Sequence, residues 1–123
     1  MAWKKGFELP REVYMQTVWF IRDYPRIKEE YDGLIEKSHP MDGQPRGTDV
    51  GDPTGQTAIR CAELSDKLKA VDDALGAIPK EYRQYIFESV VYRAPYPSFA
   101  ALNTWKTYRR RFIYFVAIIM EFV

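Results

Sequence analysis

The chain has 123 residues, of which 46% are apolar and 28% are charged, and its formal net charge is +1. That composition is typical of a globular protein and excludes disorder along the whole chain. A single cysteine, Cys61, excludes an internal disulfide and a cysteine-based zinc site, and a single histidine, His39, gives little material for a catalytic triad. The longest apolar stretch, Phe112 to Met120, is too short to cross a bilayer, and the N-terminus lacks an apolar signal core. We expect a cytoplasmic, non-enzymatic protein with no membrane contact, no metal and no cofactor.

Two helices are predicted in the first 37 residues. Pro10 suits the first turn of a helix that runs to about residue 23, in which Tyr14, Val18 and Ile21 share one face. Pro25 ends or kinks that helix, and a second helix is expected over residues 26–37. Residues 38–52 are rich in Pro, Gly and Asp, which indicates a loop that serves either as a linker or as a binding loop.

A long central helix is predicted over residues 53–78. Asp52 followed by Pro53 is a helix-start pattern, with a capping side chain and a proline at the first helical position. Apolar residues then recur at alternating spacings of three and four: Cys61, Leu64, Leu68, Val71, Leu75 and Ile78. Such a stripe packs either on the chain's own helices or on a second copy, so this helix is also a candidate homodimer contact.

Two more helices are predicted in the C-terminal part. Pro79 favours a helix to about residue 91, followed by a rigid connector at residues 94–97. Ser98 is expected to cap a one-turn helix over residues 99–102, and Asn103 to cap the last helix. A second stripe follows there: Trp105, Tyr108, Phe112, Phe115, Ile119 and Phe122. No segment alternates with period two, so the fold class is all-α, a small helical domain with a long central helix and a compact C-terminal helix-turn-helix-like unit.

Charge divides the chain into unlike regions. We expect an N-terminal helical region at residues 1–37, a loop or linker at 38–52, and a long helix plus DNA-binding region at 53–123. Residues 1–52 carry net −2, residues 53–78 net −1, and residues 79–123 net +4. Between residues 98 and 120 there are four basic residues and no acidic one. The near-neutral total therefore does not exclude binding to nucleic acid through the C-terminal region.

Polar and basic side chains gather on one side of the last predicted helix. At 100° per residue this side lies opposite Trp105, with two of the arginines at the edges of the aromatic stripe. The candidate DNA-binding residues are Asn103, Lys106, Thr107, Arg109, Arg110, Arg111 and Tyr114. Arginine and lysine bond guanine, asparagine bonds adenine, and hydroxyl groups bond phosphate, so the set suits a DNA major groove. The alternative is that these residues form the solvated face of a core helix.

Four short motifs stand in order along the chain and carry a family resemblance. They are Asp52-Pro53-Thr54, Ile78-Pro79-Lys80-Glu81-Tyr82-Arg83, Tyr96-Pro97 with Asn103-Thr104-Trp105-Lys106, and Arg110-Arg111-Phe112-Ile113-Tyr114. Together with Asp23-Tyr24-Pro25, this series resembles the RinA-type transcriptional regulators of phages and prophages of Gram-positive bacteria. The resemblance implies an all-α activator of phage late genes, with a C-terminal region similar to the helix-turn-helix of sigma-factor region 4.

The resemblance also implies partners and residue roles. Double-stranded DNA is the expected ligand, and RNA polymerase is a candidate protein partner. Lys106, Thr107 and Arg110 would face bases, and Arg109 and Arg111 would hold phosphates. The alternative function is that of a non-enzymatic phage interaction or assembly protein, such as a small terminase subunit.

Overall fold

The computed structural model describes residues 7–38 and 54–123, and this part of the chain is all-α. Its five helices are α1 (Arg11–Arg22), α2 (Tyr24–Ser38), α3 (Thr54–Leu75), α4 (Lys80–Val91) and α5 (Leu102–Ile119), with no strand among the described residues. The predicted fold class is confirmed. The predicted helix start at residues 52–53 and nearly all of the predicted loop lie outside the described residues.

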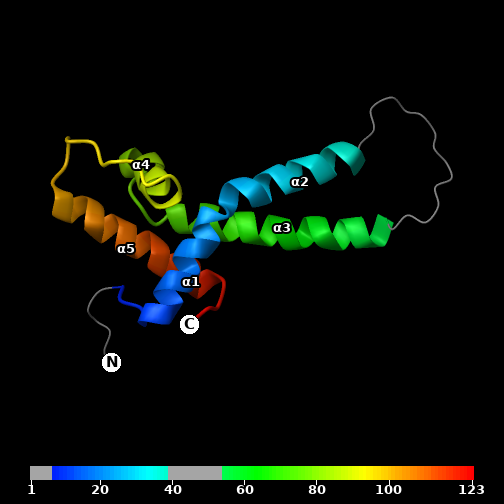
Figure 1. Ribbon diagram of the computed structural model, residues 1–123, viewed down its shortest axis with the longest axis horizontal. Helices are drawn as coiled ribbons and strands as arrows, with labels where there is room; N and C mark the ends of the chain where they lie inside the picture. The colour runs from blue at the N-terminus through cyan, green and yellow to red at the C-terminus, as the bar shows by residue number, and fades with distance from the viewer. Residues whose placement is uncertain (1–6, 39–53) are drawn as a thin grey trace.

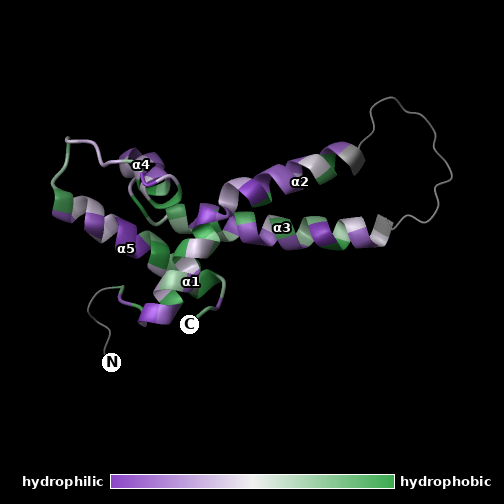
Figure 2. Cartoon of the chain, in the orientation of Figure 1, coloured by the Kyte–Doolittle hydropathy of each residue, from purple (hydrophilic) through white to green (hydrophobic). Residues whose placement is uncertain are grey.

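The helices form two groups, joined by α3 (Figure 1). The antiparallel pair α2 and α3 projects to one side, and α1, α4 and α5 gather around the C-terminal end of α3. Hydrophobic segments concentrate where α1, α4 and α5 meet, whereas the projecting pair is mostly polar on its surface (Figure 2). The main core therefore lies at the end of the molecule that carries α5.

Prolines set the helix starts much as predicted. Pro10 and Pro79 occupy the N-cap positions of α1 and α4, and each carbonyl accepts a 2.9 Å bond from the amide four or three residues later. Pro25 falls in the first turn of α2, where a missing N–H costs nothing. The second helix consequently begins at Tyr24, two residues earlier than predicted.

The main core draws on four helices and the turn before α4. Its fully buried side chains are Val18, Ile21, Val71, Ala74, Ile78, Ile86, Val90, Trp105, Phe112, Ile113 and Val116. A smaller cluster of Ile27, Leu64 and Leu68 joins α2 to the middle of α3.

The predicted stripe of the central helix is covered by the chain itself. Leu64 and Leu68 pack against α2, and Val71 and Ile78 belong to the main core. Burial of these four side chains leaves no apolar seam along residues 64–78 for a second copy. The helix also ends at Leu75, three residues before the predicted end, in a turn that leads to Pro79.

The buried face of α5 turns away from the predicted stripe along the helix. Trp105 and Phe112 are fully buried as predicted, but the buried face continues through Ile113, Val116 and Ala117, while Ile119 is 42% exposed. In a straight helix of 3.6 residues per turn, residues seven apart do not point in the same direction, so a stripe built on a seven-residue repeat moves gradually around the helix. Residues eleven apart, such as Trp105 and Val116, are more closely aligned on one face. The prediction for Ile119 was wrong for this reason.

Helix α5 ends in a turn that strains one residue. Phe122 N–H donates to Ala117 O at 2.8 Å and Glu121 N–H donates to Ile118 O at 3.0 Å, the paired bonds of a Schellman motif. Glu121 has φ 60°, the left-handed region in which a Cβ atom is unfavourable.

Glu121→Gly is expected to raise the free energy of unfolding by about 0.5–1 kcal/mol, because it removes this strain and a negative charge at a helix C-terminus. Urea denaturation measures the change. Glu81→Gly is the control: Glu81 is exposed in the first turn of α4, and glycine there should destabilise by about 1 kcal/mol. A loss of stability at position 121 would contradict the argument.

Candidate nucleic-acid interface

Burial of Trp105 sets the rotation of α5. Its indole Nε1 donates to Pro97 O at 3.0 Å, and its ring stacks on Tyr96 with 5.4 Å between centroids and 3° between planes. The ring of Tyr82 on α4 meets it edge-on at 5.0 Å. These contacts fasten the first turn of α5 to both α4 and the connector that precedes α5.

The opposite side of α5 is exposed and polar at its N-terminal end, which lies at one edge of the molecule (Figure 1). Asn103, Lys106, Thr107 and Arg110 are all exposed there, as the sequence predicted. Thr107 Oγ1 donates to Asn103 O at 2.9 Å, which leaves the hydroxyl lone pairs and the methyl group facing outward. We call these four residues the polar face of α5.

Asn103 does not cap the helix. Ala101 holds the N-cap position in an extended conformation, and its carbonyl accepts bonds from the amides of Thr104 and Trp105. The stacking of Trp105 on the connector pulls the helix start back to Leu102, so Asn103 lies inside the first turn with its side chain exposed. The predicted cap was wrong, and the amide is left available for an external partner.

The predicted one-turn helix over residues 99–102 is also absent. Ser98 and Phe99 form a simple turn, and an irregular connector links Val91, the end of α4, to Leu102, the start of α5. A helix-turn-helix joins its helices by a turn of about three or four residues. Here α4 itself packs against α5 and supports it across a longer connector with two prolines.

Arg109 and Arg111 flank the polar face in different environments. Arg109 is half-buried, and its guanidinium donates to the Tyr14 hydroxyl at 3.0 Å. Arg111 donates to Ala77 O at 3.4 Å, and its guanidinium carbon lies 5.3 Å from the ring centroids of both Phe7 and Tyr108. Its Nε is buried without a hydrogen-bond partner among the described residues. Packing therefore engages Arg111 within the fold, on the side away from the polar face.

Tyr114 packs against Phe7 of the N-terminal segment, unlike the exposed residues of the polar face. Its ring lies 5.2 Å from that of Phe7 and 5.5 Å from that of Phe115, and it is half-buried. The exposed part of the candidate interface thus spans residues 103–110.

Two arginines that the sequence analysis did not single out extend the interface. The pKa of the Arg22 guanidinium is lowered, first by burial and then by the positive charges of Arg93 and Arg109. Arg22 of α1 therefore lies close to Arg93 of the connector and to Arg109 of α5. Arg22 Nε donates to Val90 O at 2.8 Å, which ties it to the end of α4. No local pattern marks Arg22 as part of this cluster, because Val90, Arg93 and Arg109 are all distant from it in the sequence.

Charge pairing differs between the two ends of the molecule. Within residues 7–38 and 54–123, the ion pairs lie on α2, on α3 and at Asp23, the residue that joins α1 to α2. Among the same residues, no carboxylate pairs with Arg22, Arg93, Lys106, Arg109 or Arg110. The cations at the end that carries α5 therefore lack ion-pair partners among the described residues, and the net charge of +4 over residues 79–123 favours an anionic partner.

No protein-family model matches this chain, and neither a curated protein nor a solved structure matches it. The resemblance to RinA-type regulators stays a prediction. In the described part of the chain, no group of His, Cys, Asp and Glu side chains is arranged to hold a metal ion. None of the described helices is long and apolar enough to cross a membrane.

The different environments of Arg110 and Arg111 predict different effects on stability. Arg111→Ala should lower the free energy of unfolding by about 1–2 kcal/mol, because it removes the bond to Ala77 O and the packing on two rings. Arg110→Ala should change it by less than about 0.5 kcal/mol, since Arg110 is exposed. Urea denaturation of both variants tests the distinction, and equal losses would contradict it.

Proposed function

We propose that this protein binds double-stranded DNA through the polar face of α5 and acts as a non-enzymatic transcriptional regulator of the phage or prophage type. The observation that carries the proposal is the cluster of unpaired cations around the exposed N-terminal half of α5. Every ion pair among the described residues lies on α2, on α3 or at Asp23, and residues 79–123 carry net +4, so the charge around α5 is more positive than the total of +1 indicates.

The side chains of the polar face fit the edges of base pairs. Lys106 and Arg110 donate to guanine O6 and N7, and the amide of Asn103 matches adenine. Thr107 presents its methyl group to the methyl group of thymine, because its hydroxyl proton is held by Asn103 O. Arg109 at the edge of the face contacts the phosphate backbone, which sets the register of the helix in the groove.

The regulatory role follows from the resemblance, and RNA polymerase is a further proposed partner. A net charge of +4 over residues 79–123 is modest for a DNA-binding region, so the affinity of one chain for random DNA is expected to be weak. RNA polymerase bound at the same promoter would supply the additional contacts.

One observation favours an assembly role as a second candidate. Trp19 on α1 is 57% exposed and Val123 at the C-terminus is 56% exposed, and Trp19 shares a shallow hollow with Phe20 and Phe122. Exposed apolar groups of this size are frequent where copies of a chain associate. Solution mass separates the functions, because a ring of many copies favours packaging by a small terminase subunit and a monomer or dimer favours regulation.

Titration with duplex DNA at several salt concentrations tests the proposed function. If the protein neutralises about four phosphates, a plot of log affinity against log salt concentration should have a slope of about −3.6. Fluorescence anisotropy with duplexes selected from a randomised pool supplies both the affinity and the slope. Absence of binding at low salt would refute the proposal.

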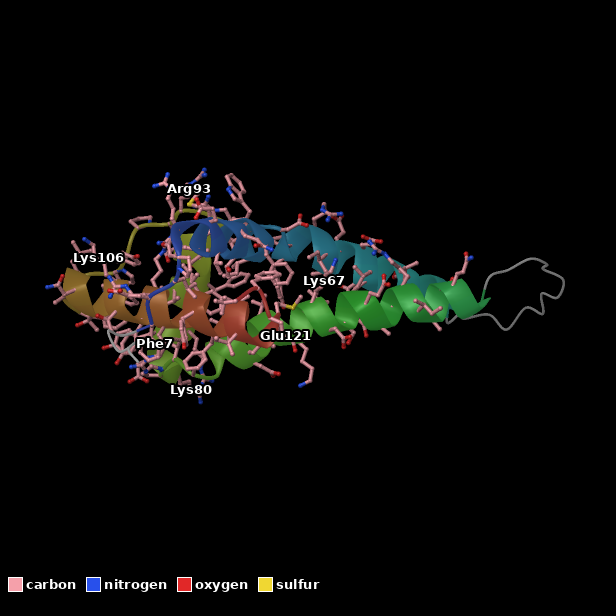
Figure 3. The ribbon with its side chains drawn as sticks, turned by 90° about the horizontal axis from the view of Figure 1, so that it is seen from below. Phe7, Lys67, Lys80, Arg93, Lys106 and Glu121 are labelled. Carbon is pink, nitrogen blue, oxygen red and sulfur yellow. The ribbon has the colours of Figure 1, made fainter. Side chains whose placement is uncertain are left out.

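Arg110→Ala should weaken binding to the selected duplex by about 1–3 kcal/mol and to an unrelated duplex by less, because it removes a base contact. Lys80→Gln is the matched control. Lys80 is an exposed cation on the opposite side of the molecule from Arg93 and Lys106 (Figure 3), and its removal should leave both affinities unchanged. An equal loss for Arg110→Ala on both duplexes would contradict the base-reading role.

A further inference from the structure

A groove of about 260 Å³ lies beside the polar face of α5. It is lined by Tyr14 from α1, by Tyr96 from the connector, and by Lys106, Arg109 and Arg110 from α5. One water molecule occupies about 30 Å³ in the liquid, so the groove has room for a larger polar group. It is built by α1 together with α5 and the connector that precedes α5, and none of its lining residues is acidic.

The hydrogen-bonding groups of the groove are mainly donors. The Tyr14 oxygen accepts a hydrogen bond from Arg109, so the Tyr14 hydroxyl proton remains available for a different acceptor. No described residue supplies that acceptor. The Arg109 guanidinium has further N–H groups beyond the one that Tyr14 accepts. Lys106 and Arg110 likewise have no acceptor among the described residues. A site with these donors and three positive charges suits an oxyanion.

Two of the donors, Tyr14 and Arg109, are held in place before any ligand arrives. Tyr96 is stacked on Trp105, which is fully buried. Tyr14 stands on α1 beside the core residues Val18 and Ile21, and its bond to Arg109 fixes the guanidinium across the groove. A site formed in advance loses little conformational freedom on binding, and this favours affinity.

Positive charge continues from the groove along the end of α4. Burial, and then the positive charges of Arg93 and Arg109, lower the pKa of Arg22, so both arginines lie close enough to Arg22 to act on its charge. Arg93 has φ 57°, a left-handed conformation that ordinarily favours glycine. Its side chain lies on the same side of the molecule as that of Lys106 (Figure 3).

We propose that the groove binds one phosphate group of the DNA backbone, with the Tyr14 hydroxyl and the Arg109 guanidinium donating to its oxygens. Arg93 binds the next phosphate along the same strand. This inference rests on the proposed function, since the phosphate belongs to the duplex whose bases the polar face of α5 reads.

Tyr14→Phe tests the site with little change in packing, because it removes only the hydroxyl group. Affinity for the selected duplex and for an unrelated duplex should fall by the same factor, about ten- to a hundredfold, as expected for a hydrogen bond to a charged group. Tyr85→Phe is the matched control: Tyr85 is exposed on α4 and does not line the groove, so its affinity should equal that of the original protein. Unchanged binding in Tyr14→Phe would overturn the inference and leave the proposed function standing.

Arg93→Gly separates binding from stability. Glycine relieves the left-handed conformation, so the thermal midpoint should not fall, whereas loss of the charge should weaken duplex binding about three- to tenfold and reduce the salt slope by about 1. Lys80→Gln removes a charge on the opposite side and should leave the slope unchanged. A slope equal to that of the original protein in Arg93→Gly would overturn the contact.

Titration with inorganic phosphate tests the groove without DNA. Phosphate should shift the NMR signal of Arg109 Nε, and the shift should be smaller in Tyr14→Phe. If phosphate shifts this signal but no duplex binds at low salt, the groove takes a free phosphate and the assignment to the DNA backbone is overturned. If duplex binds but phosphate leaves the signal unchanged, the groove does not hold an anion and the proposed function survives alone.

Discussion

The burial of Trp105 determines what the C-terminal helix presents to its surroundings. Once this side chain is fixed by Pro97 O and by the rings of Tyr82 and Tyr96, the geometry of an α-helix turns Lys106 and Arg110 toward solvent. The polar face is therefore a direct result of aromatic packing on the other side of α5. Any change that releases the indole alters the direction of the whole face.

The distribution of charge carries more information than its total. On α2 and α3, Arg60 makes a bidentate pair with Glu30 at 2.8 and 3.0 Å, and exposed pairs of this kind contribute little stability. Their main effect is to neutralise that part of the surface. Around α5 the cations have no such partners among the described residues, so the electric field of the molecule is concentrated at one end.

Local signals in the sequence predicted most of the fold, and long-range contacts account for what they missed. Prolines 10 and 79 mark helix starts because proline has no N–H to lose there. Asn103 failed as a cap because the docking of Trp105 on the connector decides where α5 begins. The positions of Arg22 and Arg93 beside α5 could not be predicted, since they depend on how α1 and α4 pack. The exposed residues of the candidate site followed from helical periodicity alone.

Helix α3 takes part in two hydrophobic clusters of unequal size. Val71 joins a core built from four helices, whereas Leu64 and Leu68 belong to a smaller cluster with Ile27, which is covered by Phe20 of α1 and by Tyr24, Tyr31 and Leu34 of α2. A few buried side chains resist opening less than a large core does, so the outer part of the α2–α3 pair unfolds locally at a lower free energy than the rest. Amino-acid changes near the start of α3 therefore alter this local opening and leave the orientation of α5 intact.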